Sequence, residues 1–377
     1  MVDTIITRSN PIIYDPRVGK IYRSLSKRYS TLILGWNREG VLKKTSDNYI
    51  GDLKLFNLKA PLAKPSLVAY FPLFWMWILF NLFVYRPKVV HACDLDTILP
   101  CYIYKTIFRR KLVFDVFDRY AMCYIPQFLE PGSRKFKTLY SLVNFFEDLF
   151  SKESDVLVST SDELLKTYQR MPKHSATIMN CFEDRAFDRV KSENHMLTLS
   201  YTGNIMRNRG LDKIAAAIKG LNNVEFIIAG RVIDKELLDH ILELSNVKYK
   251  GLLQQTDALA LEACSDTIIS LADFKVPNNF TIPNKIFEAM MLGVPVISNM
   301  AHELINKSNS GIIVEYNDID QIKAAIVLLR DNIELRRMLG NNGRKAFLQK
   351  YNWTIMEQEL YKIYEYLLGH VKLRSNC

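Results

Sequence analysis

The sequence is poor in the residues that mark specialised architectures, since its 377 residues include only 15 glycines, 13 prolines and 6 cysteines. These low numbers exclude a collagen-like or low-complexity chain. The cysteines are scattered, with no C-x-x-C pair, so neither a disulfide framework nor a metal site is predicted. Residues 1–8 lack a basic stretch followed by a long apolar run, so no secretory signal is expected. Together these absences predict a cytoplasmic protein with reduced thiols.

Acidic residues are scarce in one half of the chain. Residues 1–190 hold 28 of the 50 basic residues but only 19 of the 40 acidic ones, whereas the remainder is nearly balanced. The basic surplus predicts an anionic partner for the first half. No basic helix or aromatic stacking platform accompanies it, so nucleic acid is not expected as a partner.

Charge is absent altogether from residues 66–85, which contain a single amide, Asn81. This segment is long enough to span a membrane. Pro72 and the short distance to the next strand favour instead a helix that is buried or lies in the membrane interface. Trp75 and Trp77 prefer the headgroup region, and cations flank the segment. We predict a membrane-interface helix near 66–85, with an ordinary core helix and a true span as alternatives.

Short apolar runs alternate with helical stretches along the whole chain. Residues 31–34, 112–114 and 155–158 illustrate these runs in the first half, and 197–201 and 224–229 in the second. This alternation is typical of parallel sheets covered by helices on both faces. The predicted fold class is therefore α/β, with two doubly wound Rossmann-like domains.

A polar segment without periodicity, residues 183–196, is the predicted linker between the domains. The predicted division is an N-terminal, acceptor-side domain over 1–185 and a C-terminal domain over 195–351. A closing helix over 352–377 is expected to cross back to the first domain. Ligands of such sheets bind at the carboxyl ends of the strands, so a cleft between the domains is the expected site.

The most informative segment is T-I-P-N-K-I-F-E-A-M-M-L-G-V-P-V-I-S, residues 281–298. Thr281 and the proline near it predict a helix start, which offers free N–H groups to an anion. Asn284 and Lys285 follow on the polar face, and Glu288, one turn further, is placed to accept hydrogen bonds from a diol such as a ribose. A well-capped amphipathic helix without a ligand is the alternative interpretation.

The segment from Pro283 to Ile297 resembles the nucleotide-sugar segment of family 4 glycosyltransferases, which have the GT-B fold. Other segments resemble this family and follow in the family's order: 15–20, 32–38, 89–96, 114–118 and 201–211. The resemblance implies a metal-independent enzyme without a cofactor, in which the C-terminal domain holds most of a nucleotide sugar. Transferred residue by residue, it implies catalytic roles for Arg209, Arg207, Asp118 and His91. It implies donor contacts by Gly19, Gly203, Asn204, Leu252, Thr281, Asn284, Lys285, Ile286, Phe287 and Glu288.

The chain departs from the family pattern at three positions. Phe280 stands where the family often has a glutamate that contacts the transferred sugar, which leaves Asn278, Asn279 or Thr281 for that contact. Phe117 replaces the histidine before Asp118, and Asn204 replaces a frequent arginine.

The resemblance implies a retaining hexosyltransferase that uses a UDP- or GDP-sugar to extend a glycan or lipid-linked glycan, as in cell-surface polysaccharide or glycoconjugate biosynthesis. The basic first half and the uncharged segment together predict three further features. These are a polyprenyl-linked acceptor, peripheral contact with an anionic membrane, and a location at the cytoplasmic face of that membrane. A nucleotide-sugar 2-epimerase of the same fold and a non-catalytic partner subunit are the alternatives.

Overall fold

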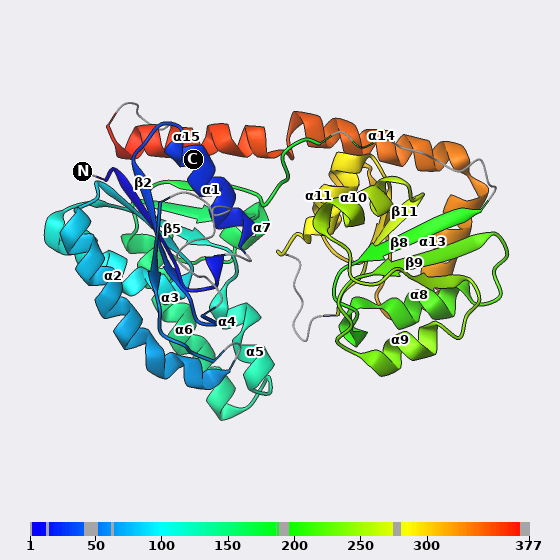
Figure 1. Cartoon of the computed structure of the whole chain (residues 1–377), viewed down its shortest axis with the longest axis horizontal. Coiled ribbons are helices and arrows are strands. Elements are labelled where there is room, and N and C mark those ends of the chain that lie inside the picture. The colour runs from blue at the N-terminus through cyan, green and yellow to red at the C-terminus, as the bar shows by residue number, and fades with distance from the viewer. Residues whose placement is uncertain are drawn as a thin grey trace. The chain divides into compact units, whose positions relative to one another are not determined.

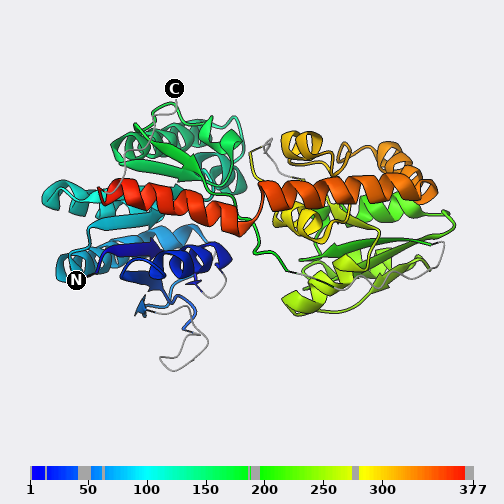
Figure 2. The ribbon, with the colours of Figure 1, turned by 90° about the horizontal axis from the view of Figure 1, so that it is seen from above.

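The computed structural model describes residues 2–12, 15–40, 52–61, 64–185, 187, 196–273 and 280–369. The chain divides into two compact units (Figure 1). The first comprises Met1–Asn180 together with Met356–Cys377, and the second comprises Cys181–Ile355. The last helix, α15 (Trp353–Leu367), therefore belongs mostly to the first unit, on which it lies in Figure 2.

The first unit is built on a seven-stranded parallel sheet in the order β3-β2-β1-β4-β5-β6-β7. Its central strands are buried along their whole length, as expected when helices cover both faces of a parallel sheet. The order reverses direction at β1 and β4, which is the doubly wound topology predicted from the sequence. The strands are β1 (Thr4–Arg8), β2 (Thr31–Trp36), β3 (Leu53–Phe56), β4 (Val89–Cys93), β5 (Lys111–Val116), β6 (Val156–Ser159) and β7 (Ser175–Thr177).

Helical elements connect these strands. The uncharged segment of the sequence forms the 3-10 turn η2 and helix α2, which packs against α3. Only Phe74, Ile78, Asn81 and Leu82 of α2 are buried. The helical elements are α1 (Pro16–Ser26), η2 (Pro65–Tyr70), α2 (Phe71–Tyr85), α3 (Leu95–Phe108), α4 (Tyr120–Cys123), α5 (Ile125–Phe128), α6 (Arg134–Glu153) and α7 (Asp162–Leu165).

The second unit has a six-stranded parallel sheet in the order β10-β9-β8-β11-β12-β13. It too is doubly wound, so the predicted fold class is confirmed for both units. Its strands are β8 (Leu197–Thr202), β9 (Val224–Ala229), β10 (Val247–Tyr249), β11 (Thr267–Ser270), β12 (Val296–Ser298) and β13 (Gly311–Ile313). Its helical elements are η3 (Arg207–Arg209), α8 (Leu211–Ile218), α9 (Lys235–Ile241), α10 (Gln255–Ala263), α11 (Asn284–Leu292), α12 (His302–Ser308), α13 (Ile319–Asp331) and α14 (Ile333–Gln349).

Helix α11 carries the motif singled out in the sequence, but its N-cap lies two residues later than predicted. Pro283 has extended backbone angles at the N-cap position, so Thr281 does not cap the helix. Gly293 ends it in the left-handed conformation (φ 60°), which glycine adopts without steric cost. The buried strand β12 follows, as expected.

Two sequence predictions fall partly or wholly outside the described residues. Asn278 and Asn279, candidates for the sugar contact, belong to the segment 274–279, and most of the predicted linker belongs to 188–195. The five cysteines within the described residues are free thiols, three of them buried.

Candidate functional site

Three loops meet at the carboxyl ends of β8, β9 and β10 in the second unit. The Gly203 amide donates to the Ala229 carbonyl, and the Gly230 amide donates to the Gly251 carbonyl, both at about the length of a strong hydrogen bond (2.9 and 2.8 Å). A Cβ atom on Gly230 would lie 1.9 Å from the Gly203 carbonyl oxygen, and its φ of 140° is one that side chains rarely adopt. Only glycine allows this approach, which brings the Gly203 backbone against Gly230, and Gly230 in turn is bonded to Gly251, the residue before Leu252.

Two arginines of the 3-10 turn η3 differ in their surroundings. Arg207 is exposed and forms ion pairs with Asp234 (2.8 Å) and Glu236 (3.4 Å). Arg209 is half-buried, and no carboxylate of the described residues lies within ion-pair distance of it. Gly210 follows in the left-handed conformation and begins α8. The two arginines predicted from the sequence therefore differ: the Arg207 guanidinium is paired with carboxylates, whereas the Arg209 guanidinium is available to an anion.

Helix α11 is joined to the end of β8 by Lys285. The Lys285 ammonium donates to Thr202 Oγ1 (2.5 Å), to Glu262 Oε1 (2.8 Å) and to Glu288 Oε2 (3.4 Å). Thr202 also donates to Glu262 Oε1 at 2.5 Å. All three N–H bonds of the ammonium are thus directed to protein acceptors. This placement favours Lys285 as a bridge within the protein over the phosphate contact predicted from the sequence.

Glu288 is the carboxylate that this bridge leaves partly exposed. Burial, opposed by Lys285 and reinforced by the neighbouring Glu262 charge, raises the pKa of Glu288 to about 7. Burial acts to lower the pKa of Lys285, but Glu262 and Glu288 hold it above its ordinary value. Around neutral pH, Glu288 therefore exchanges a proton while Lys285 stays charged.

The other predicted donor contacts divide into exposed and buried positions. Asn204, Leu252 and Asn284 are exposed, and Leu252 keeps 70% of its surface accessible. Ile286 and Phe287 are completely buried, so they can offer a ligand only their backbone groups. Gly203 is exposed, and Thr281 and Glu288 are half-buried.

Glu262 is a residue that sequence reasoning missed. It lies on α10, which packs against α11, and its side chain is completely buried. In the sequence it is one glutamate among the polar positions of an ordinary helix, so no local signal distinguishes it. Only the packing of α10 against α11 shows that it contacts Lys285.

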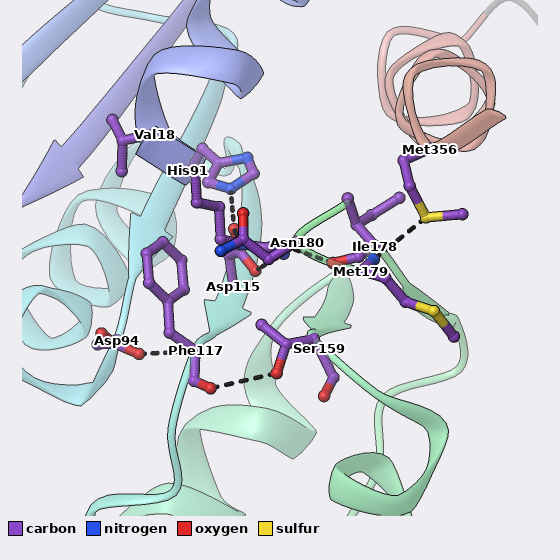
Figure 3. Close-up of polar contacts among 12 residues, drawn as sticks. Val18, His91, Asp94, Asp115, Phe117, Ser159, Ile178, Met179, Asn180 and Met356 are labelled. Atoms are coloured by element: carbon purple, nitrogen blue, oxygen red, sulfur yellow. Dashed lines mark hydrogen bonds and ion pairs between the residues drawn. The ribbon is translucent and has the colours of Figure 1, made fainter. Parts of the chain in front are cut away.

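The first unit carries a buried network of charges at the carboxyl ends of β1, β4 and β5. Arg8 forms ion pairs with Asp15 (2.6 Å) and with Asp94, and the Phe117 ring lies 4.1 Å from its guanidinium. Figure 3 shows Asp94 accepting from the Phe117 amide (2.8 Å). Burial raises the pKa of Asp94 to about 7, against the attraction of Arg8. Because Asp94 is bound within the protein and Ser9 donates to Asp96, the sequence Asp94-Leu95-Asp96 does not form an open metal-binding pair.

Asp118 follows β5 and is half-buried. Burial raises its pKa, while Arg8 lowers it. A carboxyl group with a raised pKa at a strand end suits the role in proton transfer or acceptor binding that the sequence predicts. That role stays a prediction.

His91 is completely buried in the sheet, and both of its ring nitrogens have partners. Nε2 lies 3.1 Å from Asp115 Oδ2, and Nδ1 lies 3.0 Å from the hydroxyl of Tyr364 on α15 (Figure 3 shows the His91–Asp115 contact). Arg17 donates to both oxygens of Asp115, at 2.7 and 3.2 Å. This placement favours a structural role for His91 over the catalytic one predicted from the sequence.

Gly19 lies in a helix and not in the loop predicted from the sequence. It lies in the first turn of α1 rather than in a loop, it is buried, and its amide donates to the Asp15 carbonyl at 3.3 Å. The predicted phosphate approach through its N–H group has no support from this geometry.

One group of side chains within the described residues has metal-ligand chemistry. His91, Cys93 and Asp115 offer ligand atoms within 4.8 Å of one another, and all three are buried. Both Asp115 oxygens are already bonded to Arg17, whose positive charge opposes a cation there. The residues present do not fit a metal ion.

Residues 197–332 match the sequence profile of the family described as Glycosyl transferases group 1. Among curated proteins, the chain is similar to the capsular polysaccharide biosynthesis glycosyltransferase CapM of Staphylococcus aureus, with 26% identity over 189 residues. That match covers 46% of this chain and 47% of CapM, so the chain spans about half the length of the relative it matches.

Solved structures resemble the chain over nearly its full length. Sucrose-phosphate synthase from Thermosynechococcus elongatus has a TM-score of 0.78 at 13% identity, covering 98% of this chain and 100% of that one. Anabaena HepE in complex with UDP and glucose has a TM-score of 0.69 at 12% identity, covering 97% and 100%. At such identities the likeness establishes the fold alone.

The two doubly wound units and these neighbours define a protein with the fold of GT-B glycosyltransferases. Within its second unit, residues 197–332 are similar to the group 1 glycosyl transferases. This match supports, for residues 197–332, the family resemblance found in the sequence.

Proposed function

We propose that this chain is a retaining, metal-independent glycosyltransferase that takes a hexose from a UDP- or GDP-sugar. The observation that carries the proposal is the arrangement in the second unit. There, Glu288 of α11 and Arg209, which has no ion pair with a carboxylate of the described residues, lie in the segment that matches the family. The match to CapM supports an acceptor glycan of a cell-surface polysaccharide. No specific feature of the site favours the 2-epimerase or the non-catalytic subunit.

The proposed chemistry uses charge and positioning. The bond between the anomeric carbon and the diphosphate breaks, a bond to an acceptor hydroxyl oxygen forms, and the hydroxyl proton passes to the leaving phosphate. Arg209 stabilises the charge that grows on that phosphate, since a guanidinium binds two phosphate oxygens at once. The backbone around Asn284 approaches the diphosphate, Glu288 binds the ribose, and Asp118 of the first unit contacts the acceptor.

The first test is a thermal-shift screen of UDP- and GDP-sugars. A donor at a hundredfold excess over its Kd stabilises its unit by about 2.7 kcal/mol, which corresponds to a rise in Tm of roughly 5–10 °C. Glu288→Ala should lose this rise because it removes the ribose contact, whereas the exposed Glu334→Ala on α14 should keep it. The donor found is then incubated with polyprenyl-diphosphate glycans, and the nucleoside diphosphate released is measured.

Three results would contradict the proposal. Absence of stabilisation by every nucleotide sugar would count against a donor site. Conversion of the donor into its 2-epimer without any acceptor would support the 2-epimerase, and binding without transfer would support a non-catalytic subunit.

An apolar face on the first unit supports the proposed contact with a membrane. It is formed by η2, α2 and the end of α3, and Figure 1 shows α2 on the outer side of that unit. Within the described residues, Pro65–Tyr85 is a helical segment long and apolar enough to cross a bilayer, but one of its sides packs within the unit. The exposed side chains of this face are Val68, Leu73, Met76, Phe80, Phe83, Val84, Ile107 and Phe108.

Cations adjoin one end of this apolar face. The Phe83 and Phe108 rings lie 5.5 Å apart, which brings the C-terminal ends of α2 and α3 together. The exposed cations that follow these ends in the sequence are Arg86, Lys88, Arg109 and Lys111. An apolar face beside cations suits the interface of an anionic membrane, and a cytoplasmic location at such a membrane is part of the proposal.

The exposed residues of α2 identify the variant that tests this contact. Trp75 donates to the Asp96 carbonyl (2.7 Å) and Trp77 packs on Phe56 (5.5 Å), so neither is the best probe. Met76→Asp with Phe80→Asp should lower binding to phosphatidylglycerol vesicles at least about a hundredfold in a flotation assay, since each side chain buried in the membrane contributes about 1.5–3 kcal/mol.

The matched control for this variant lies in the second unit. Leu328→Asp with Met338→Asp changes exposed apolar residues of α13 and α14 and should leave vesicle binding unchanged. Equal flotation of the wild type and the α2 variant would refute the membrane proposal.

A further inference from the structure

Glu262 is a fully buried carboxylate next to the proposed donor site that none of the roles assigned above uses. Its Oε1 atom accepts from Lys285 (2.8 Å) and from Thr202 (2.5 Å). Its Oε2 atom has no hydrogen-bond partner among the described residues. Burying an ionised carboxylate is unfavourable, and a second glutamate nearby makes it more so. The position of Glu262 on α10 therefore needs an explanation.

The distances around the Lys285 ammonium show which of its three acceptors it contacts most closely. The contacts to Thr202 (2.5 Å) and Glu262 (2.8 Å) are short, whereas the contact to Glu288 is 3.4 Å. Glu262 and Thr202 lie on α10 and β8, and they hold the ammonium away from Glu288 on its own helix. The carboxylate of Glu288 is left with hydrogen-bonding capacity.

We propose that Glu262 is a positioning residue which, with Thr202, holds Lys285 back so that the Glu288 carboxylate stays available to a pair of ligand hydroxyl groups. The inference rests on the proposed function, because the hydroxyl pair is the ribose diol of a nucleotide sugar. Without Glu262, the ammonium is free to pair directly with Glu288 and occupy the oxygens that the diol needs. Without Lys285, the buried carboxylate of Glu262 and the half-buried carboxylate of Glu288 lack a compensating positive charge.

The charges that face Glu288 determine the sign of each effect on pH dependence. They are Lys285 on its own helix and Glu262 on α10, with the Tyr201 ring of β8 lying 5.6 Å from the Lys285 ammonium. Since burial brings the pKa of Glu288 to about 7, ligand affinity should rise with pH around that value. Removing the Glu262 charge lowers this pKa, whereas removing the Lys285 charge raises it.

The experiment measures the Kd of the full-length chain for UDP-glucose and GDP-mannose by calorimetry between pH 5.5 and 8.5. The diphosphate of a nucleotide sugar does not titrate in this range, so the pH dependence reports on the protein. In Glu262→Gln the midpoint should move to lower pH, and in Lys285→Met it should move to higher pH. At pH 8.5, Glu262→Gln should bind about tenfold more weakly than the wild type.

The 2′-deoxy analogue of the same nucleotide sugar separates positioning from a structural role. The wild type should bind the analogue about tenfold more weakly, because one hydroxyl donor to Glu288 is lost. In Glu262→Gln this ratio should fall below about threefold, since Glu288 is then occupied by Lys285. Thr202→Val, which leaves every charge in place, should lower the ratio without moving the midpoint.

Glu225→Gln is the matched control. Glu225 is a nearly buried carboxylate of the same unit that is also paired with a lysine, Lys248, and this variant should bind as the wild type does. The inference alone would be overturned if Glu262→Gln kept the wild-type pH midpoint of binding and if both Glu262→Gln and Thr202→Val kept the wild-type ratio of affinities for the nucleotide sugar and its 2′-deoxy analogue. Failure of the wild type to bind any nucleotide sugar would overturn the proposed function with it.

Discussion

Replacing Arg209 with alanine is expected to lower kcat of the proposed transfer by about 10²- to 10³-fold, which corresponds to the 2.7–4 kcal/mol that one donor to a developing anion contributes. The reason is the isolation of its guanidinium, which no carboxylate of the described residues neutralises. The measurement is steady-state release of nucleoside diphosphate with the donor and acceptor identified by screening. KM for the donor should change less than kcat, because the charge on the leaving phosphate grows in the transition state.

Arg207 provides a control within the same turn. Its ion pairs with Asp234 and Glu236 already neutralise it, and its side chain is two-thirds exposed. Arg207→Ala should therefore reduce kcat by less than about tenfold. A larger effect for Arg207→Ala than for Arg209→Ala would show that the leaving phosphate is bound by the other arginine.

Replacing Asp115 with alanine is expected to reduce the free energy of unfolding of the first unit by about 3–5 kcal/mol. The change leaves Arg17 buried without its carboxylate, and it removes the partner of His91 Nε2. Although burial acts to raise the pKa of Asp115, Arg17 and His91 hold it below its ordinary value. A carboxyl group with a lowered pKa stabilises the fold above its unfolded-state pKa, so the difference between variant and wild type should shrink below about pH 4.

Urea unfolding followed by tryptophan fluorescence measures this difference. Trp36, Trp75 and Trp77 belong to the first unit and only Trp353 to the second, so the signal reports mainly on the first. Glu365→Ala breaks the exposed pair with Arg28 and should cost at most about 1 kcal/mol. A comparable loss in both variants would show that the buried network has no special role in stability.

The fold followed from the sequence because its signal is repeated many times. Each parallel strand is buried on both faces and reads as a short apolar run, and each connection reads as a helix, so errors at single elements do not change the result. Helix α11 shows the limit of this reasoning, since Thr281 looked like a cap and the helix begins at Asn284. Gly19 shows it as well, because a glycine near a predicted loop lies in the first turn of α1.

The proposed site was predicted only where its residues are neighbours in the chain. Asn284, Lys285 and Glu288 share one helix, so helical periodicity places them together. Glu262 precedes Lys285 by 23 residues and has an ordinary helical context, so no spacing rule connects the two. His91 at a strand end was compatible with either catalysis or packing, and only its contacts with Asp115 and Tyr364 favour packing.

The order of apolar and polar residues by itself determined two doubly wound units, the amphipathic helix α11 and the uncharged segment of α2. Tertiary structure alone decided which charges are free and which are bound, separating Arg209 from Arg207 and making Lys285 a bridge between Glu262 and Glu288. The physical reason is that secondary structure depends on short-range periodicity. The state of a charge depends on the groups that folding brings within a few ångströms and on how much water remains around it.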